Sequence, residues 1–237
     1  MKIFYPLKFV LIFSVIMAFS SVSGCAFSCF NTKFDAADFL MSRPHQPDGS
    51  SQVLLVQRCG FWIFTRTIVY VMEQREGNWS AVSPPMDAVI GRNGFAPPGE
   101  KREGDGKTPS GIFPLVMAFG YADSANTKML YRQIKEDDIW VDDSEAADYN
   151  RWTKQSVTQS TSYERMKRDD DLYKYGIVIA YNTNPVVQGR GSAIFVHVWK
   201  DKSVPTAGCV AVSEENILRL LHWLDPAAAP LIIMGLK

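Results

Sequence analysis

A histidine and a cysteine near the carboxyl end of the chain are the residues whose types and spacing could do chemistry. His197 lies in the apolar run IFVHVW, and Cys209 follows it by 12 positions in TAGCVAV. A thiol beside an imidazole can lose its proton to the ring, and the resulting thiolate and imidazolium stabilise each other. The pair therefore predicts a cysteine nucleophile that is active near neutral pH, with His197 as its base.

The two apolar runs must bring these side chains together. If they form an antiparallel hairpin that turns through Lys200 to Pro205, centred on Ser203, His197 and Cys209 lie directly opposite each other. Directly opposed residues have Cβ atoms about 4.5 to 5.5 Å apart, close enough for an imidazole to approach a thiol. The prediction depends on the register, because a slip of one residue sends the two side chains to opposite faces of the sheet.

The backbone next to the nucleophile suggests how a reacting carbonyl would be held. Gly208 directly precedes Cys209 and has no side chain to block a substrate. The amides of Gly208 and Cys209 are therefore candidate donors to an oxyanion. A histidine facing a cysteine is also common as an ordinary packed pair, so the spacing alone does not establish catalysis.

The first 25 residues have the layout of an export signal. Lys2 and Lys8 precede an apolar run, and small residues follow it. Residues 1–24 therefore read as a secretory signal peptide, which is too short and wrongly flanked for a membrane span. The end of this segment, VSGC, resembles the bacterial lipobox, in which the cysteine is lipidated. We expect export to the periplasm or cell envelope, with membrane attachment through a lipidated Cys25; a plain signal peptide cut nearby is the alternative.

Export places the four cysteines in an oxidising compartment, where spare thiols tend to pair. If Cys25 carries lipid, Cys29 and Cys59 can form a disulfide, which leaves Cys209 as a free thiol. The alternative is that Cys29 and Cys59 are unpaired, small apolar residues. The sequence leaves both arrangements open.

Composition limits the architecture and the partners. The 237 residues are 46% hydrophobic, enough for one sizeable core. Lys plus Arg and Asp plus Glu number 25 each, so no overall charge favours a nucleic acid partner. Residues 25–51 read as a tether with one helical turn at 35–41, and the folded domain is expected at 52–237.

The patterns within 52–237 predict a mainly β domain with a few helices. Its first half is expected to hold a hairpin and a short strand, followed by a long structured loop. Its second half is expected to end in three strands, a helix capped by Ser213 and a last strand. The expected strands are 52–57, 61–73, 79–82, 176–181, 192–199, 208–212 and 231–236; the hairpin turn is 58–60, the long loop is 84–111, and helices are expected at 162–168 and 213–224.

Two motifs resemble the YkuD-type L,D-transpeptidase catalytic domain. That family has a His, a variable loop, then Ser or Thr, any residue, Gly and Cys; Thr206, Gly208 and Cys209 match this pattern behind His197. The segment KTPSGIF, from 107 to 113, is similar to the family's Thr-Pro-x-Gly-x-Phe stretch. The likeness spans 52–237, and the chain looks most like the branch with His-x-Trp and Pro-Thr-Ala-Gly-Cys-Val.

The resemblance implies a β-sandwich-like catalytic domain that acts on the stem peptides of peptidoglycan. Cys209 would attack the carbonyl of the L-centre in a diamino-acid residue, expel the terminal D-amino acid and leave a thioester. His197 would take the thiol proton and later activate the acceptor. An amine acceptor gives a crosslink, whereas water gives an L,D-carboxypeptidase; neither reaction needs a metal or an organic cofactor.

Candidate substrate-binding residues are Thr206, Lys107, Trp140 and Asn150, although a scaffold role is open for each. Many family members also follow the catalytic His with Gly and the Gly-Cys-Val with Arg, whereas this chain has other residues at both positions. Those departures, Val198 and Ala211, keep two alternatives open.

The first alternative is a hydrolase that uses the same Cys and His on stem peptides or on protein-peptidoglycan links. The second is a non-catalytic, wall-binding lipoprotein that retains the fold. A papain-like peptidase is disfavoured, because in that family the catalytic Cys precedes the His in sequence.

Overall fold

The computed structural model describes residues 35–42, 49–61 and 64–236. The expected signal peptide at 1–24 and the cysteines Cys25 and Cys29 lie outside these residues. Within them, no helix is both long enough and apolar enough to cross a membrane.

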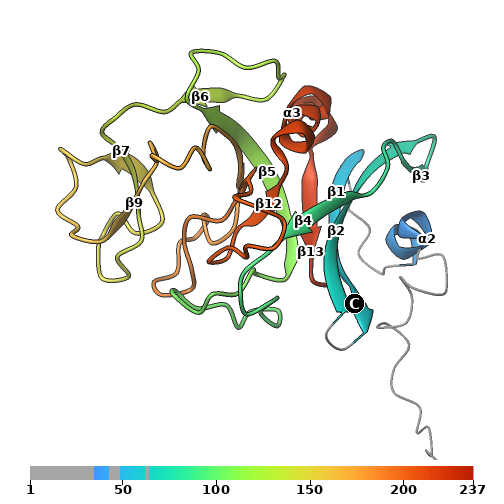
Figure 1. The fold of residues 1–237 in the computed structure, drawn as a ribbon, viewed down its shortest axis with the longest axis horizontal. Helices are drawn as coiled ribbons and strands as arrows, with labels where there is room; N and C mark the ends of the chain where they lie inside the picture. Colours follow the sequence, from blue (N-terminus) through green and yellow to red (C-terminus); the bar gives the residue numbers. More distant parts are fainter. Residues whose placement is uncertain (1–34, 43–48, 62–63, 237) are drawn as a thin grey trace, which may run out of the picture.

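The described chain is 37% strand and 10% helix, which confirms the predicted mainly β fold with few helices. Figure 1 shows these elements as arrows and coils. In chain order they are α2 (Ala36–Met41), β1 (Gln52–Phe61), β2 (Phe64–Arg75), β3 (Asn78–Ala81), β4 (Met86–Val89), β5 (Gly111–Gly120), β6 (Tyr131–Gln133), β7 (Asp138–Val141), β8 (Trp152–Lys154), β9 (Tyr163–Arg165), β10 (Tyr175–Ile179), β11 (Phe195–Val198), β12 (Val210–Val212), α3 (Glu214–Trp223), a 3-10 turn (Pro226–Ala228) and β13 (Leu231–Met234).

The main sheet closes on itself. Its strands follow the order β1-β13-β5-β10-β11-β12-β4-β2, and β1 also pairs with β2. β3 extends the sheet from β2, and β6 extends it from β5. Closure leaves few unpaired edges and wraps the strands around an apolar interior, which gives the sandwich-like arrangement expected from the sequence.

Alternating residues of these strands fill the interior, together with one face of α3. Ile217, Leu220 and Leu221 of this helix are buried in that core. The helix begins where the sequence predicts, because the Ser213 side chain accepts a hydrogen bond from the amide of Asn216.

The hairpin of β1 and β2 is longer than expected. Arg58 pairs with Thr67, and Gly60 with Thr65, so the predicted turn at 58–60 is wrong. Regular antiparallel pairing continues through Gly60, which has a φ of 122° that a glycine can adopt within the ladder. Cys59 in this stretch is buried and disulfide-bonded, and its partner lies outside the described residues.

The expected helical turn at 35–41 is the helix α2. Its N-cap Asp35 accepts hydrogen bonds from the amides of Ala37 and Asp38. Leu40 is fully buried and packs on a separate apolar cluster formed by β1, β2, β3 and β13. The helix is therefore docked on the outer face of the sheet.

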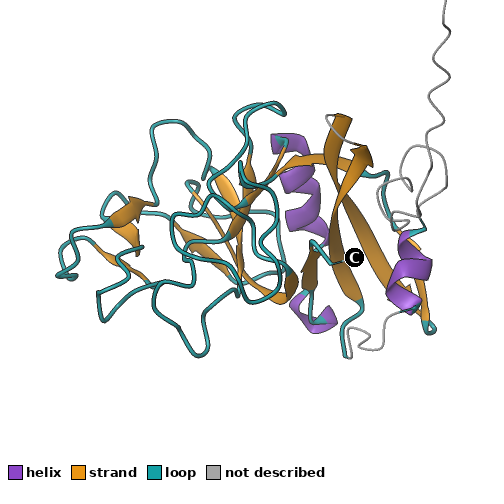
Figure 2. Ribbon diagram, turned by 90° about the horizontal axis from the view of Figure 1, so that it is seen from below, coloured by secondary structure: helices purple, strands orange, loops and turns teal. Residues whose placement is uncertain are grey.

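A second, smaller sheet, β8-β7-β9, covers part of the main sheet. It lies at the end of the molecule opposite the β1–β2 hairpin (Figures 1 and 2). The helix predicted at 162–168 is wrong, because Tyr163 and Arg165 pair with Val141 and Ile139 as strand β9. Strands of three or four residues carry too little periodicity to be recognised, so tertiary pairing decides their structure.

Between the small sheet and the main sheet lies an aromatic core. Its rings meet edge to face, with centroids of Phe195 4.9 Å from Trp140, 5.2 Å from Phe119 and 5.6 Å from Tyr173. Cys209 belongs to the same cluster. The second core therefore surrounds the sequence-predicted nucleophile.

The long loop contains the short strand β4, and its remainder, 90–110, is pinned to the segment before β12. The hydroxyl of Thr108 donates to the carbonyl of Gly208 (2.7 Å) and accepts from the amide of Gly91 (2.9 Å). The amide of Thr206 also donates to the carbonyl of Ile90, and Thr108 is fully buried. The two sequence motifs thus meet at one hydroxyl group.

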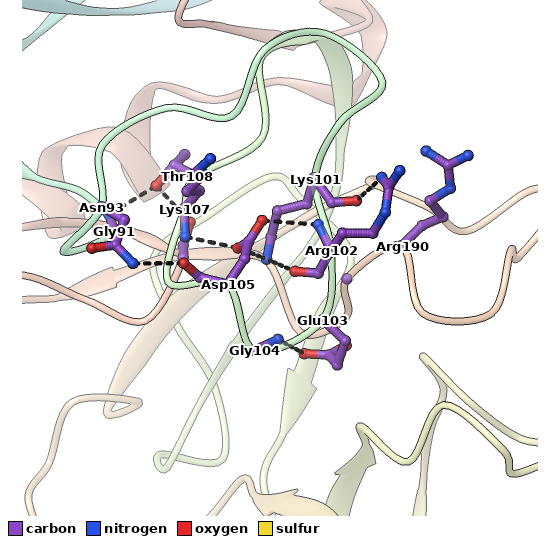
Figure 3. Close-up of polar contacts among 12 residues, drawn as sticks. Gly91, Asn93, Lys101, Arg102, Glu103, Gly104, Asp105, Lys107, Thr108 and Arg190 are labelled. Atoms are coloured by element: carbon purple, nitrogen blue, oxygen red, sulfur yellow. Dashed lines mark hydrogen bonds and ion pairs between the residues drawn. The ribbon is translucent and has the colours of Figure 1, made fainter.

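Figure 3 shows how the tip of this loop is held by one carboxylate. Asp105 accepts from the Lys101 ammonium at 2.6 Å and from the amides of Arg102 and Lys107 at 2.9 and 2.8 Å. Asn93 donates to the Asp105 carbonyl at 2.7 Å. These bonds fix the loop without regular secondary structure.

The Thr108 hydroxyl can be tested by an isosteric change. We expect Thr108→Val to lower the free energy of unfolding by about 1 to 3 kcal/mol, because it leaves a buried N–H and a buried carbonyl without their partner. Thr108→Ser keeps the hydroxyl and is expected to stay much closer to the wild type. Urea denaturation measures both, and a Val variant as stable as the Ser variant would contradict the assigned role.

Candidate functional site

The strands that carry the candidate pair run parallel, so the predicted antiparallel hairpin is wrong. Val196 pairs with Val210, and His197 pairs with Ala211 instead of Cys209. The connection between the strands does not turn back tightly, because Thr206 within it is hydrogen-bonded to the backbone of Ile90 and Arg92.

The two side chains nevertheless share one face. Val196 and Val210 point into the main core, whereas Phe195 and Cys209 belong to the aromatic core on the other side. Since side chains alternate along a strand, His197 lies on the face of Cys209, diagonally across the strand pair. Both residues line one cavity of about 590 Å³.

The thiol of Cys209 is held by two backbone groups. The thiol donates a hydrogen bond to the carbonyl oxygen of Ala193, 3.2 Å from Sγ. Sγ also accepts a hydrogen bond from the amide of Phe195 at 3.4 Å. Only 8% of the residue is exposed. Burial raises the pKa of this thiol to about 12, and the nearby Glu164 carboxylate adds to the increase. Cys209 is a free thiol.

His197 is buried and neutral. Its Nδ1 lies 2.7 Å from the carbonyl oxygen of Val198. A carbonyl can only accept, so Nδ1 carries the proton and Nε2 carries the lone pair that a base needs. Burial lowers the pKa of His197 to about 4; the Val198 carbonyl opposes that decrease, and the positive charge of Arg168 adds to it.

The free protein therefore holds a neutral thiol and a neutral imidazole. The expected thiolate is not favoured in the free protein, because burial raises the pKa of Cys209 and lowers the pKa of His197. No hydrogen bond joins His197 and Cys209 in the part of the chain that the structure describes; the thiol is turned to Ala193.

Most backbone polar groups around Gly208 already form hydrogen bonds within the protein. Its amide donates to the Thr206 hydroxyl at 3.2 Å, and that hydroxyl donates to the carbonyl of Cys209 at 2.6 Å. A side chain at Gly208 would come 3.1 Å from the carbonyl oxygen of Lys107. Of the two candidate oxyanion donors, the Gly208 amide is thus already used, and the Cys209 amide remains the candidate.

Thr206 lines the cavity, but the other three candidate substrate-binding residues do not. Trp140 donates its indole N–H to the Asn150 side-chain oxygen at 2.8 Å, and that oxygen also accepts from the amide of Ala193 at 3.2 Å. Both residues are buried. They position the backbone of Ala193, whose carbonyl accepts the hydrogen bond from the thiol. Lys107 contributes a backbone amide to Asp105.

Sequence reasoning missed a charged cluster behind the pair. Tyr173 stacks edge to face on the His197 ring at 5.2 Å and donates its hydroxyl to Glu164 at 2.7 Å. Arg168 also contacts Glu164, at 3.0 Å. Burial raises the pKa of Glu164, and Tyr173 and Arg168 counter that increase. These residues come from β9 and the segment after it, which has no recognisable motif.

Lys101 is a second omission. It lines the cavity although only 4% of it is exposed, and its ammonium is paired with Asp105 at 2.6 Å. The run KREGDGKTPSG predicts a functional loop, but nothing in it distinguishes the buried Lys101 from the half-buried Lys107. Position 211, where many relatives of the resembled family carry Arg, holds a fully buried alanine.

Comparison with known proteins places the chain in a family. The profile of the YkuD family, described as the L,D-transpeptidase catalytic domain, matches residues 63–233. A solved structure of Bdellovibrio bacteriovorus Bd1075 is 17% identical, with a TM-score of 0.41, over 78% of this chain and 48% of that one, so the chain spans about half of its length. No curated protein matched significantly. Because the profile covers most of its length, the chain belongs to the YkuD family of L,D-transpeptidase catalytic domains.

Proposed function

We propose that this protein is a cysteine acyltransferase that acts on the stem peptides of peptidoglycan through a thioester at Cys209. The observation that carries the proposal is that Cys209 and His197 lie on one face of two paired strands and line the same cavity. Membership of the L,D-transpeptidase family supplies the substrate class. The residue assignment rests on the geometry and on the match of both motifs.

The neutral resting pair determines how the first step proceeds. Because neither ion is stable before substrate binds, the thiol proton moves to Nε2 of His197 as the sulfur–carbon bond forms. The Cys209 amide then donates to the developing oxyanion. His197 returns the proton to the departing amine as the bond to the terminal D-amino acid breaks, which leaves the thioester and a neutral imidazole.

The sulfur must leave its resting partners for this step. In the free protein it donates to the Ala193 carbonyl, so attack requires rotation of the side chain toward the substrate. The carbonyl itself is held in place by Asn150 through the Ala193 amide. The scaffold thus keeps the thiol in one defined position until a substrate carbonyl enters.

The cell envelope is the proposed location. Residues 1–25 have the pattern of an export signal, with Cys25 as the proposed site of lipid attachment. The disulfide at Cys59 supports an oxidising compartment, because such bonds are rare in reducing ones.

One observation favours a second function, a wall-binding protein without catalysis. A thiol with a raised pKa next to a histidine with a lowered pKa is also what a structural packed pair would show. In that case the cavity would bind stem peptides without forming a thioester.

Replacement of the nucleophile tests the proposal. We expect Cys209→Ala to reduce release of the terminal D-amino acid from tetrapeptide stems by on the order of a thousandfold or more, because no other group replaces the sulfur. Cys209→Ser keeps the shape with a poorer nucleophile and should be almost as inactive. Circular dichroism of both variants verifies the fold, and full activity in the Ala variant would sink the assignment.

The pH dependence of thiol alkylation tests the electrostatics of the free protein. Since the thiolate is the reactive form and the pKa of Cys209 is about 12, the alkylation rate should rise with pH through the alkaline range without a plateau near neutrality. The Cys209→Ala variant measures the background alkylation of the remaining cysteines. A plateau beginning near pH 7 would show a stabilised thiolate and contradict the neutral resting pair.

A further inference from the structure

A second cavity, of about 580 Å³, adjoins the proposed catalytic cavity. We call it the basic groove. It is formed by the start of β2, by β4 and the residues after it, and by part of the connection between β11 and β12. Its lining includes Arg58, Arg66, Asp87, Arg92, Lys202 and Pro205.

The charge of this groove is unbalanced. Four cationic side chains line it against the single carboxylate of Asp87. In the described part of the chain none of these four cations forms an ion pair, whereas Lys101 and Arg168 of the catalytic cavity do. Because the whole chain carries equal numbers of positive and negative residues, this unpaired excess is local. It favours an anionic ligand.

The groove lies directly beside the catalytic cavity. Val89, Arg92 and Pro205 line both. The wall between them is the segment that leads to Cys209, and it is fixed because Thr206 is bonded to the backbone of Ile90 and Arg92. A ligand that fills the groove would therefore lie next to the catalytic cavity, with Pro205 at their shared border.

The cations suit carboxylates on an extended ligand. Guanidinium groups bind carboxylates in a planar, two-point geometry, and three of the four cations are arginines. Arg66 and Lys202 are exposed and have no hydrogen bond among the described residues, so they are free to take up a ligand. Arg58 is oriented by its bond to the Thr65 hydroxyl at 2.9 Å.

We propose that the basic groove binds the carboxylates of the acceptor stem peptide and thereby delivers its amine to the Cys209 thioester. The inference rests on the proposed function, because it requires an acyl-enzyme. In this step the amine nitrogen bonds to the thioester carbon, and the sulfur–carbon bond breaks. His197 takes a proton from the attacking amine and returns it to the sulfur, which restores the neutral pair.

The test uses the double variant Arg66→Gln/Lys202→Gln in the full mature chain. We expect its KM for an amine-bearing, carboxylate-bearing acceptor peptide to rise about tenfold, since each screened surface contact contributes modestly. Acylation of Cys209 by a tetrapeptide without acceptor should proceed at the wild-type rate. Added salt should raise the acceptor KM of the wild type and change that of the variant little.

The control is Arg151→Gln/Lys135→Gln, which removes the same charge outside both cavities. It should keep the wild-type KM. An acceptor KM that is equal in the two double variants overturns the inference, and so does a slowed acylation in the groove variant, which would assign the groove to the donor.

Two further outcomes separate the inference from the proposed function. If the thioester forms but only water resolves it, the groove assignment fails while the donor chemistry stands. If the wild type forms no thioester at all, the proposed function fails and the inference falls with it. The last outcome concerns a phosphate ligand. If a glycerol-phosphate oligomer binds the Cys209→Ala protein more tightly than the acceptor peptide does, and this binding is lost in the groove variant, the groove is a phosphate site and the proposal is overturned.

Discussion

The site depends on one buried hydroxyl group. Thr108, in the long loop after β4, joins the Gly91 amide to the Gly208 carbonyl, directly before the nucleophile. Backbone hydrogen bonds of Thr206 with Ile90 and Arg92 join the same loop to the same segment, so the Thr108 hydroxyl adds a buried side-chain link to a backbone one. The wall that separates the catalytic cavity from the basic groove belongs to the same segment. The Thr108 hydroxyl and the Thr206 backbone bonds together fix the segment that leads to the sulfur and borders both cavities.

Burial around this anchor explains why the resting pair is neutral. Cys209 and His197 lie against the aromatic core beneath the small sheet, where charged forms are poorly solvated. The protein keeps its nucleophile protonated and bonded to the Ala193 carbonyl until a substrate brings a carbonyl within reach. The proposed reaction would then couple proton transfer to bond formation, and a protonated thiol is also less prone to oxidation.

The sequence predicted the parts of this account that depend on strong local signals. The cap at Ser213 and the mainly β fold follow from capping and periodicity. Cys209 and His197 do line one cavity, although not through the register that their spacing predicted. The parallel pairing of β11 and β12 was not predicted, because periodicity shows which face of a sheet a side chain lies on but gives no information on strand direction. The strand β9 and the half-buried Glu164 were not predicted, because their structure comes from tertiary pairing. The pKa values of Cys209 and His197 depend mainly on their burial, and burial in the folded protein cannot be predicted from the residues next to them in the sequence.

The most direct test of the central claim is the mass of the intact protein after incubation with tetrapeptide stems. The account predicts an adduct equal to the stem without its terminal D-amino acid, which peptide mapping places on Cys209 and which hydroxylamine removes as expected for a thioester. An adduct at another residue, an adduct that retains the terminal D-amino acid, or no adduct under conditions in which stem peptide demonstrably binds would contradict it.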